Sequence, residues 1–119
     1  MPQSSPPERK SVRAGEDPFD RLALAQLARA GDDLTKPTDV VNFIYFPSEV
    51  AARSAAAALE PEGYRVNVQR AVMGTKWLTQ ARVDVVLSPE NVASQRARFE
   101  DLAMTYGGEY SGWEVAVTK

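Results

Sequence analysis

The chain has 119 residues, 44% of them hydrophobic and 25% charged, which is typical of one globular domain with its own core. It contains no cysteine and no histidine, which excludes disulfides, thiolate nucleophiles, histidine general bases and the usual zinc ligands. The net charge of −2 lacks the basic excess of most nucleic-acid binders, so direct binding of nucleic acid is disfavoured.

Residues 1–16 combine proline, serine and balanced charge. Such a segment buries too little surface to offset its ordering entropy, so we expect a flexible tail. The polar start does not resemble a signal peptide, and no stretch of the sequence is apolar enough to span a bilayer. With the absence of cysteine, these features predict a cytoplasmic protein.

A first helix is predicted after Asp17, whose carboxylate can cap the free N–H groups, while Pro18 suits the first helical position. Gly31 is placed to end this helix, and a turn-rich connector follows. Helical spacing predicts one buried face, formed by Phe19, Leu22, Ala23, Leu27 and Ala30.

Four segments rich in β-branched and aromatic residues predict strands: residues 40–46, 64–70, 77–87 and 110–117. The short link between the second and third segments predicts an antiparallel hairpin. Two further helices are predicted. They begin with serine caps at Ser48 and Ser88, and they end near Leu59 and at Gly107-Gly108.

The resulting order, strand–helix–strand–strand–helix–strand, is the ferredoxin-like split βαβ pattern. We therefore predict an α+β fold, with a four-stranded antiparallel sheet, helices on one face and an extra N-terminal helix. Right-handed crossovers place both internal helices on the same face and the first and third strands in the centre. Residues 17–119 are expected to form a single domain.

The valine-rich strand faces are expected to meet the helices, and the tryptophans Trp77 and Trp113, which lie on those faces, are expected to pack in the core. Ile44 and Phe46 are expected on the opposite, open face. The polar residues expected on the open face are Arg65, Asn67, Gln69, Gln80, Arg82, Asp84, Asn42 and Glu114. A half-solvated antiparallel sheet requires no function; the alternative is a flat docking surface for a protein.

Several segments resemble the family of regulators of ribonuclease activity B (RraB). They are GDDL at residues 31–34 followed by Pro37, IYFP at residues 44–47 before an alanine-rich helix, Trp77 in the third strand, and YGGEYSGWE at residues 106–114. The resemblance covers roughly 100 residues and implies a ferredoxin-like α+β sandwich. In the best-known members it implies a protein that binds ribonuclease E and restrains its cleavage of RNA.

No catalytic motif, metal site or cofactor site is predicted. We interpret the chain as a non-catalytic regulatory protein that binds a protein partner, by resemblance a ribonuclease E-like enzyme. The alternative is a self-associating ferredoxin-like domain, such as a homodimer, with an unknown small ligand. The candidate partner-binding residues are Arg65, Asn67, Arg82, Asp84 and Glu114 on the polar face, with Asp32 and Asp33 in the connector.

Overall fold

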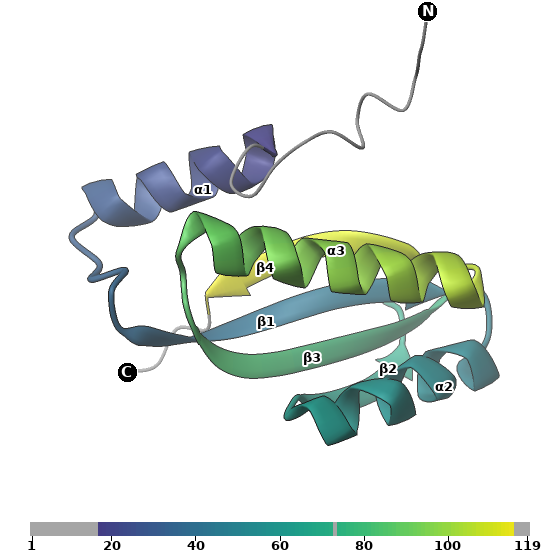
Figure 1. The fold of residues 1–119 in the computed structure, drawn as a ribbon. Coiled ribbons are helices and arrows are strands. Elements are labelled where there is room, and N and C mark those ends of the chain that lie inside the picture. Colours follow the sequence, from purple (N-terminus) through teal and green to yellow (C-terminus); the bar gives the residue numbers. More distant parts are fainter. Residues whose placement is uncertain (1–16, 73, 116–119) are drawn as a thin grey trace, which may run out of the picture.

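The computed structural model describes residues 17–72 and 74–115 (Figure 1). The predicted tail and the last residues of the predicted final strand lie outside this part of the chain. The elements in chain order are α1 (Pro18–Arg29), β1 (Pro37–Phe46), α2 (Glu49–Leu59), the short 3₁₀ helix η2 (Glu60–Glu62), β2 (Arg65–Arg70), β3 (Trp77–Val86), α3 (Pro89–Tyr106) and β4 (Glu109–Val115).

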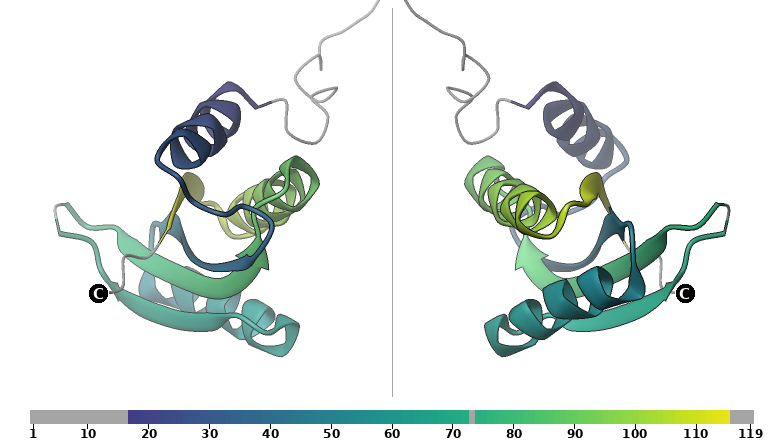
Figure 2. Two further views of the ribbon diagram at one scale, coloured as in Figure 1. Left: turned by 90° about the vertical axis from the view of Figure 1, so that its left-hand side faces the viewer. Right: turned by 90° about the vertical axis from the view of Figure 1, so that its right-hand side faces the viewer.

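The four strands form one antiparallel sheet in the order β2-β3-β1-β4. Helix α2 packs on β2 and β3, and α3 packs on β4 and β1. Both helices lie on one face, and α1 stands at the β4 end beside α3 (Figures 1 and 2). The α+β class, the ferredoxin-like order and the additional N-terminal helix are therefore confirmed.

Local chemistry explains where the two internal helices begin and where α3 ends. The Ser48 hydroxyl accepts from the Ala51 N–H at 3.2 Å, and the Ser88 hydroxyl accepts from the Asn91 N–H at 3.1 Å. Helix α3 ends at Gly107, whose φ of 74° favours glycine. Each predicted cap is therefore confirmed.

The core under α2 and α3 is built from small residues on one side and aromatics on the other. Ala52 and Ala55 of α2 are fully buried, which brings the helix backbone close to the sheet. Phe99 of α3 stacks on Tyr110 with ring centroids 5.5 Å apart and meets the edge of Tyr64 at 5.3 Å. Small side chains under α2 thus complement the large rings under α3.

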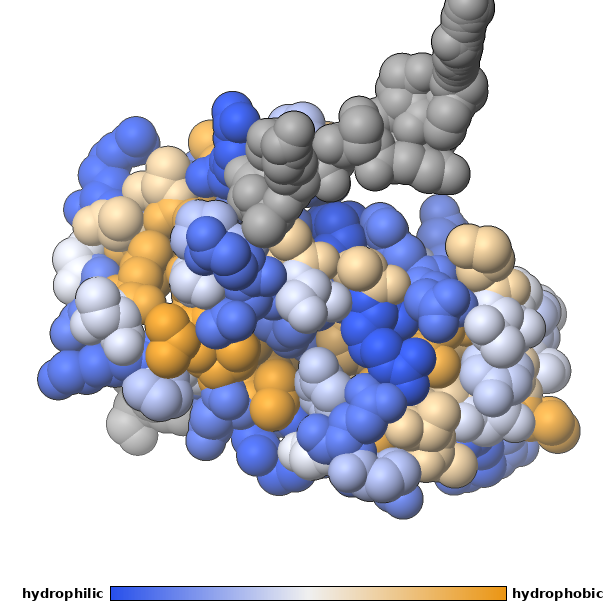
Figure 3. All heavy atoms as spheres, viewed as in Figure 1, coloured by the Kyte–Doolittle hydropathy of each residue, from blue (hydrophilic) through white to orange (hydrophobic). Residues whose placement is uncertain are grey.

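A second, smaller cluster lies beneath α1. It joins Leu24 to Val40, Leu87 and Val92. On the helix-covered side of the molecule, apolar side chains gather below α1, at the left of the view in Figure 3. This cluster extends the core to an element outside the βαββαβ unit.

The predicted packing of the two tryptophans is confirmed. Trp77 is half-buried against the core under α2 and α3, and Trp113 is half-buried against the cluster beneath α1. Valines on the same face of the sheet pack against the same clusters; they include Val66, Val68 and Val85.

The predicted buried face of α1 is only partly correct. Ala23 and Leu27 are half-buried, and Leu27 packs against the cluster beneath α1. Phe19 is 78% exposed and Leu22 is 56% exposed, whereas Asp20 and Leu24 point inward. Burial of a carboxylate is costly unless it is paired. Here Asp20 accepts hydrogen bonds from Arg96 and Trp113, and these allow a charged residue to occupy the inner face.

The predicted faces of β1, in contrast, are wrong. Asn42 is fully buried on the helix side, together with Ile44 and Phe46, so none of the three lies on the open face. Strand β1 is central and carries apolar residues on both faces, so alternation alone could not assign them. The amide of Asn42 is accommodated because it donates to the Gln95 Oε1 at 3.0 Å.

Candidate protein-binding surface

The sheet face opposite α2 and α3 is covered by none of the described helices (Figure 2). We call it the open face. Because side chains alternate along each strand, the register assigns its members. They are Arg65, Asn67 and Gln69 on β2; Leu78, Gln80, Arg82, Asp84 and Val86 on β3; Asp39, Val41, Phe43 and Tyr45 on β1; and Glu109 and Glu114 on β4.

A charged row crosses three strands of the open face and consists of Arg65, Asp39, Arg82 and Asp84. Asp39 forms an ion pair with Arg82, whose Nε also donates to Asp39 Oδ1 at 3.4 Å. Arg65 Nη2 lies 3.5 Å from Asp39 Oδ1 and 3.8 Å from Asp84 Oδ1. The row therefore links β2, β3 and β1 through alternating charges.

The hydrogen bond from Arg82 holds the pKa of Asp39 below its ordinary value, although burial acts in the opposite direction. The same hydrogen bond raises the pKa of Arg82. Both groups are therefore charged at neutral pH. A partner that meets this face encounters fixed charges of both signs.

Aromatic side chains lie beside the charged row. Phe43 and Tyr45 are half-buried on β1, and Tyr45 lies opposite Leu78 in the register. Leu78 is only 7% exposed although its strand position faces outward. Aromatic residues flanked by arginine are enriched in protein interfaces, and this chemistry favours a protein partner.

The structure brings most of the predicted site residues together. Arg65, Arg82 and Asp84 belong to the charged row, and Asn67 lies next along β2, where its amide donates to Gln69 at 3.1 Å. Glu114 is on the same face of β4, opposite Val41. The sequence reasoning missed Asp39, which completes the row, because the faces of β1 were exchanged.

Asp32 and Asp33 lie apart from the charged row, in the connector between α1 and β1. Asp33 accepts from the Thr35 N–H at 3.0 Å and from the Thr35 hydroxyl at 2.5 Å, and this hydroxyl bond is the main cause of its lowered pKa. Asp33 thus closes a turn. Together with Leu27 and Leu34, the two aspartates border a small hollow of about 70 Å³.

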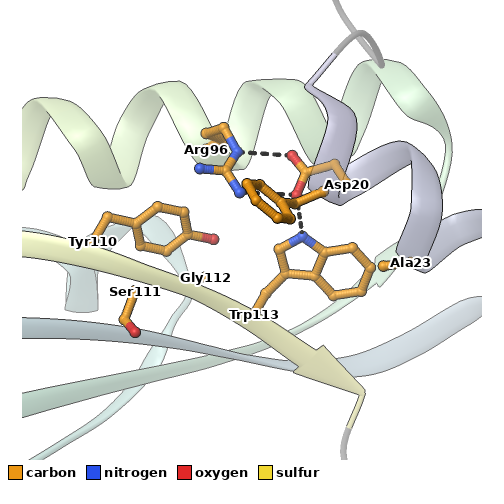
Figure 4. Close-up of a pocket in the computed structure, with 8 residues that line it drawn as sticks. Asp20, Ala23, Arg96, Tyr110, Ser111, Gly112 and Trp113 are labelled. Carbon is orange, nitrogen blue, oxygen red and sulfur yellow. Dashed lines mark hydrogen bonds and ion pairs between the residues drawn. The ribbon is translucent and has the colours of Figure 1, made fainter.

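Sequence reasoning also missed a buried ion pair that holds α1 in place (Figure 4). Arg96 Nε donates to Asp20 Oδ2 at 2.8 Å, and Arg96 Nη2 donates to Oδ1 at 2.9 Å. Trp113 Nε1 donates to the same Oδ1 at 2.8 Å. We call these three residues the α1 anchor. The sequence contains one signal for the burial of Asp20: Leu24 and Leu27 lie one and two helical turns later, on the same side of the helix. The charge of Asp20 argued against burial.

The α1 anchor borders a cleft of about 380 Å³ between α1, α3 and β4, with Tyr110 in its wall. Arg96 lies over the Tyr110 ring, 5.2 Å from its centroid. The Tyr110 hydroxyl donates to Asn42 Oδ1 at 2.8 Å, and burial raises the pKa of Tyr110. The polar side chains of Asp20, Arg96, Tyr110 and Trp113 in this cleft have partners within the chain, which indicates a structural role.

Neither a metal site nor a membrane span is found in the part of the chain that the structure describes. No three acidic side chains within residues 17–72 and 74–115 converge on a position that could hold a metal ion. Over the same ranges, no helix has the length and apolar character needed to cross a membrane.

The family model described as regulator of ribonuclease activity B matches residues 18–115. The chain belongs to the RraB family. The match spans every described helix and strand, and it confirms the family indicated by the sequence motifs. The RraB family is one of regulators rather than catalysts. No curated protein is a significant match to the chain.

Proposed function

We propose that this RraB family member is a non-catalytic cytoplasmic regulator that binds a ribonuclease E-type enzyme and restrains its cleavage of RNA. The match to the family model supports the regulatory role. The observation that carries the mode of action is the open face, where charges of both signs lie beside aromatic side chains. Occupying a partner surface requires no bond-making chemistry.

The contact surface in this proposal is centred on the charged row and extends to Asn67 and Glu114. Acidic groups outnumber basic groups on the open face once Glu114 is included with the row. A surface of this sign suits a partner segment that carries arginine or lysine. It does not suit the phosphates of RNA, so the aromatic pair on β1 is assigned to protein contacts.

Asp32 and Asp33 are proposed as a separate, secondary contact. They are exposed in the connector, and the hollow they border has apolar walls. Because none of the described ion pairs joins them to the charged row, the two contacts can be tested independently.

The test reverses two charges of the row, in the double variant Arg82→Glu with Asp84→Lys. Binding to the native ribonuclease and inhibition of RNA cleavage should both be lost. The melting temperature should change little, because solvent screens exposed ion pairs and they contribute little to stability. Titration of labelled protein against the ribonuclease, with a cleavage assay in parallel, measures both effects.

The matched control is the double variant Arg98→Glu with Asp101→Lys on α3, which reverses another exposed pair, 3.7 Å apart, on the helix-covered side. It should bind like the unmodified protein. If the β3 variant binds normally, or if the α3 variant loses binding equally, the open face is not the contact surface.

A further inference from the structure

The two edge strands of the sheet differ in how well they could accept another strand. Edge strand β4 has a register shift opposite Phe43 and Ile44, which leaves Ser111 without a partner in β1. Bulges of this kind disfavour further pairing at an edge. Edge strand β2, in contrast, pairs with β3 in unbroken register over its whole length, from Arg65 to Arg70.

A groove runs along the outer side of β2, where α2 overhangs the strand. Its volume is about 300 Å³, and it is lined by Arg53, Ala56, Ala57, Glu60, Val66, Asn67 and Val68. Arg53 and Glu60 are seven residues apart, which is two helical turns, so they lie on one side of α2. Opposite charges therefore stand near the two ends of the groove, with small side chains between them.

This arrangement is complementary to itself, and we infer that the groove and the free edge of β2 bind a second copy of this chain. In a two-fold dimer, β2 pairs antiparallel with β2 of the second copy, and α2 lies antiparallel beside the other α2. Arg53 then meets Glu60 of the second copy, and the symmetry repeats this contact. Arg53 now pairs with Glu49 at 2.8 Å, and it would lie between two carboxylates in the dimer.

The register of the dimer follows from the same groove. Its lining centres on Asn67 in the strand and on Ala56 and Ala57 in the helix. A two-fold axis at Asn67 places Asn67 opposite its own copy and Val66 opposite Val68. Both valines face the helix side and are only half-buried, so the pairing would complete their burial.

This inference does not rest on the proposed regulatory function. It concerns the outer edge of β2 and the overhanging side of α2, whereas the regulator proposal concerns the open face. The two surfaces share Asn67, whereas Arg53 and Glu60 line only the groove. Variants of Arg53 and Glu60 therefore separate loss of dimerisation from loss of ribonuclease binding.

A disulfide test of the register is free of background, because the chain contains no cysteine. The variant Asn67→Cys places one thiol in each copy at the proposed axis, where directly opposed residues approach within bonding distance. We expect it to form a covalent dimer in a glutathione redox buffer, visible on a non-reducing gel. The matched variant Gln69→Cys lies on the same strand face, off the axis, and should crosslink much more slowly. Equal crosslinking of the two variants, or none by Asn67→Cys, contradicts the register.

A charge-exchange experiment tests the helix contacts. The unmodified chain should sediment as a dimer, and Arg53→Glu or Glu60→Arg alone should raise the dissociation constant at least roughly tenfold, because each creates two like-charge contacts. An equimolar mixture of the two variants restores opposite charges at both contacts and should dimerise again. Arg21→Glu on α1 makes the same charge change away from the groove and should remain dimeric.

Circular dichroism of each variant establishes that it is folded. A folded unmodified chain that sediments as a monomer throughout, or two folded single variants whose mixture does not associate, would overturn the inference.

Discussion

The two ends of the sheet are closed by different chemistry. At the β2 end, α2 lies close to the strands through buried alanines such as Ala52 and Ala55. At the β4 end, α1 is added outside the βαββαβ unit and is held by Asp20, Arg96 and Trp113. The β2 end therefore depends on close apolar packing, and the β4 end depends on a buried ion pair as well.

This difference teaches that an extra helix can be attached through few apolar contacts when polar groups fix its position. Phe19 and Leu22 of α1 stay largely exposed, so the helix contributes little apolar area from those positions. The buried pair fixes the position of α1 instead, since a bidentate arginine–carboxylate contact restricts the relative orientation of the two side chains.

The largest expected loss of stability comes from a substitution at the β4 end. Asp20→Ala removes the partner of Arg96 and leaves a mostly buried guanidinium, so the free energy of unfolding should fall by about 3 kcal/mol. Urea denaturation followed by circular dichroism measures the change. The control, Glu49→Ala, removes an exposed pair with Arg53 at the β2 end and should cost less than about 1 kcal/mol. Equal losses would show that the α1 anchor contributes no more than a surface pair.

An intermediate loss of stability is expected at the connections between helix and strand, and it differs between the two ends. A Cβ at Gly108, between α3 and β4, would collide with the Tyr45 carbonyl oxygen and lie 2.5 Å from Phe46 Cδ1. Gly108→Ala should therefore destabilise by about 2–3 kcal/mol. At Gly63, between α2 and β2, nothing lies within 4 Å of the position that a Cβ would occupy, and only the φ of 98° opposes alanine.

Gly63→Ala should accordingly cost only about 1 kcal/mol, the strain of a left-handed conformation. Thermal melts of the two variants at one pH and salt concentration give the comparison. A loss at Gly63 as large as the loss at Gly108 would indicate that backbone conformation, rather than close approach to β1, limits both connections.

The smallest expected loss of stability concerns an ion pair between α3 and η2. Arg98 Nε of α3 donates to Glu62 Oε1 of η2 at 3.0 Å, and this bond lowers the pKa of Glu62. A carboxylate with a lowered folded-state pKa stabilises above its unfolded pKa, and this contribution is lost as the pH falls through the folded pKa.

Glu62→Gln should therefore be slightly less stable than the unmodified chain at pH 7, by less than about 1 kcal/mol. This difference in stability between the variant and the unmodified chain should disappear between about pH 5 and pH 3. Melting temperatures across this range, at low salt, provide the measurement. If the difference in stability persists at pH 3, it arises from packing and not from the charge of Glu62.

The sequence predicted the elements well because each had a local signal. Serine caps, glycine stops and β-branched runs are properties of neighbouring residues, and the structure confirms them at Ser48, Ser88 and Gly107. The order of the strands followed from chain connectivity and the handedness of crossovers. The RraB motifs gave the family.

The faces of β1 and α1 could not be predicted in the same way. Asn42 is buried because Gln95 and Tyr110, 53 and 68 residues away in the chain, bond to its amide. Asp20 is buried for a similar reason. A polar residue is predicted to be exposed unless its distant partners are known, and Asn42 was therefore assigned to the open face. This assignment exchanged the two faces of β1, so Asp39 was not predicted on the open face. Arg65, Arg82 and Asp84, on β2 and β3, were predicted on the correct face.

The α1 anchor also has a consequence for the order of folding. Asp20 meets Arg96 and Trp113 across 76 and 93 residues of chain, so the loop it closes contains nearly the whole domain. We therefore expect this contact to form after the sheet has assembled. Loss of the Asp20 carboxylate should therefore accelerate unfolding and leave the refolding rate almost unchanged, which marks α1 as the last segment to dock and the first to leave.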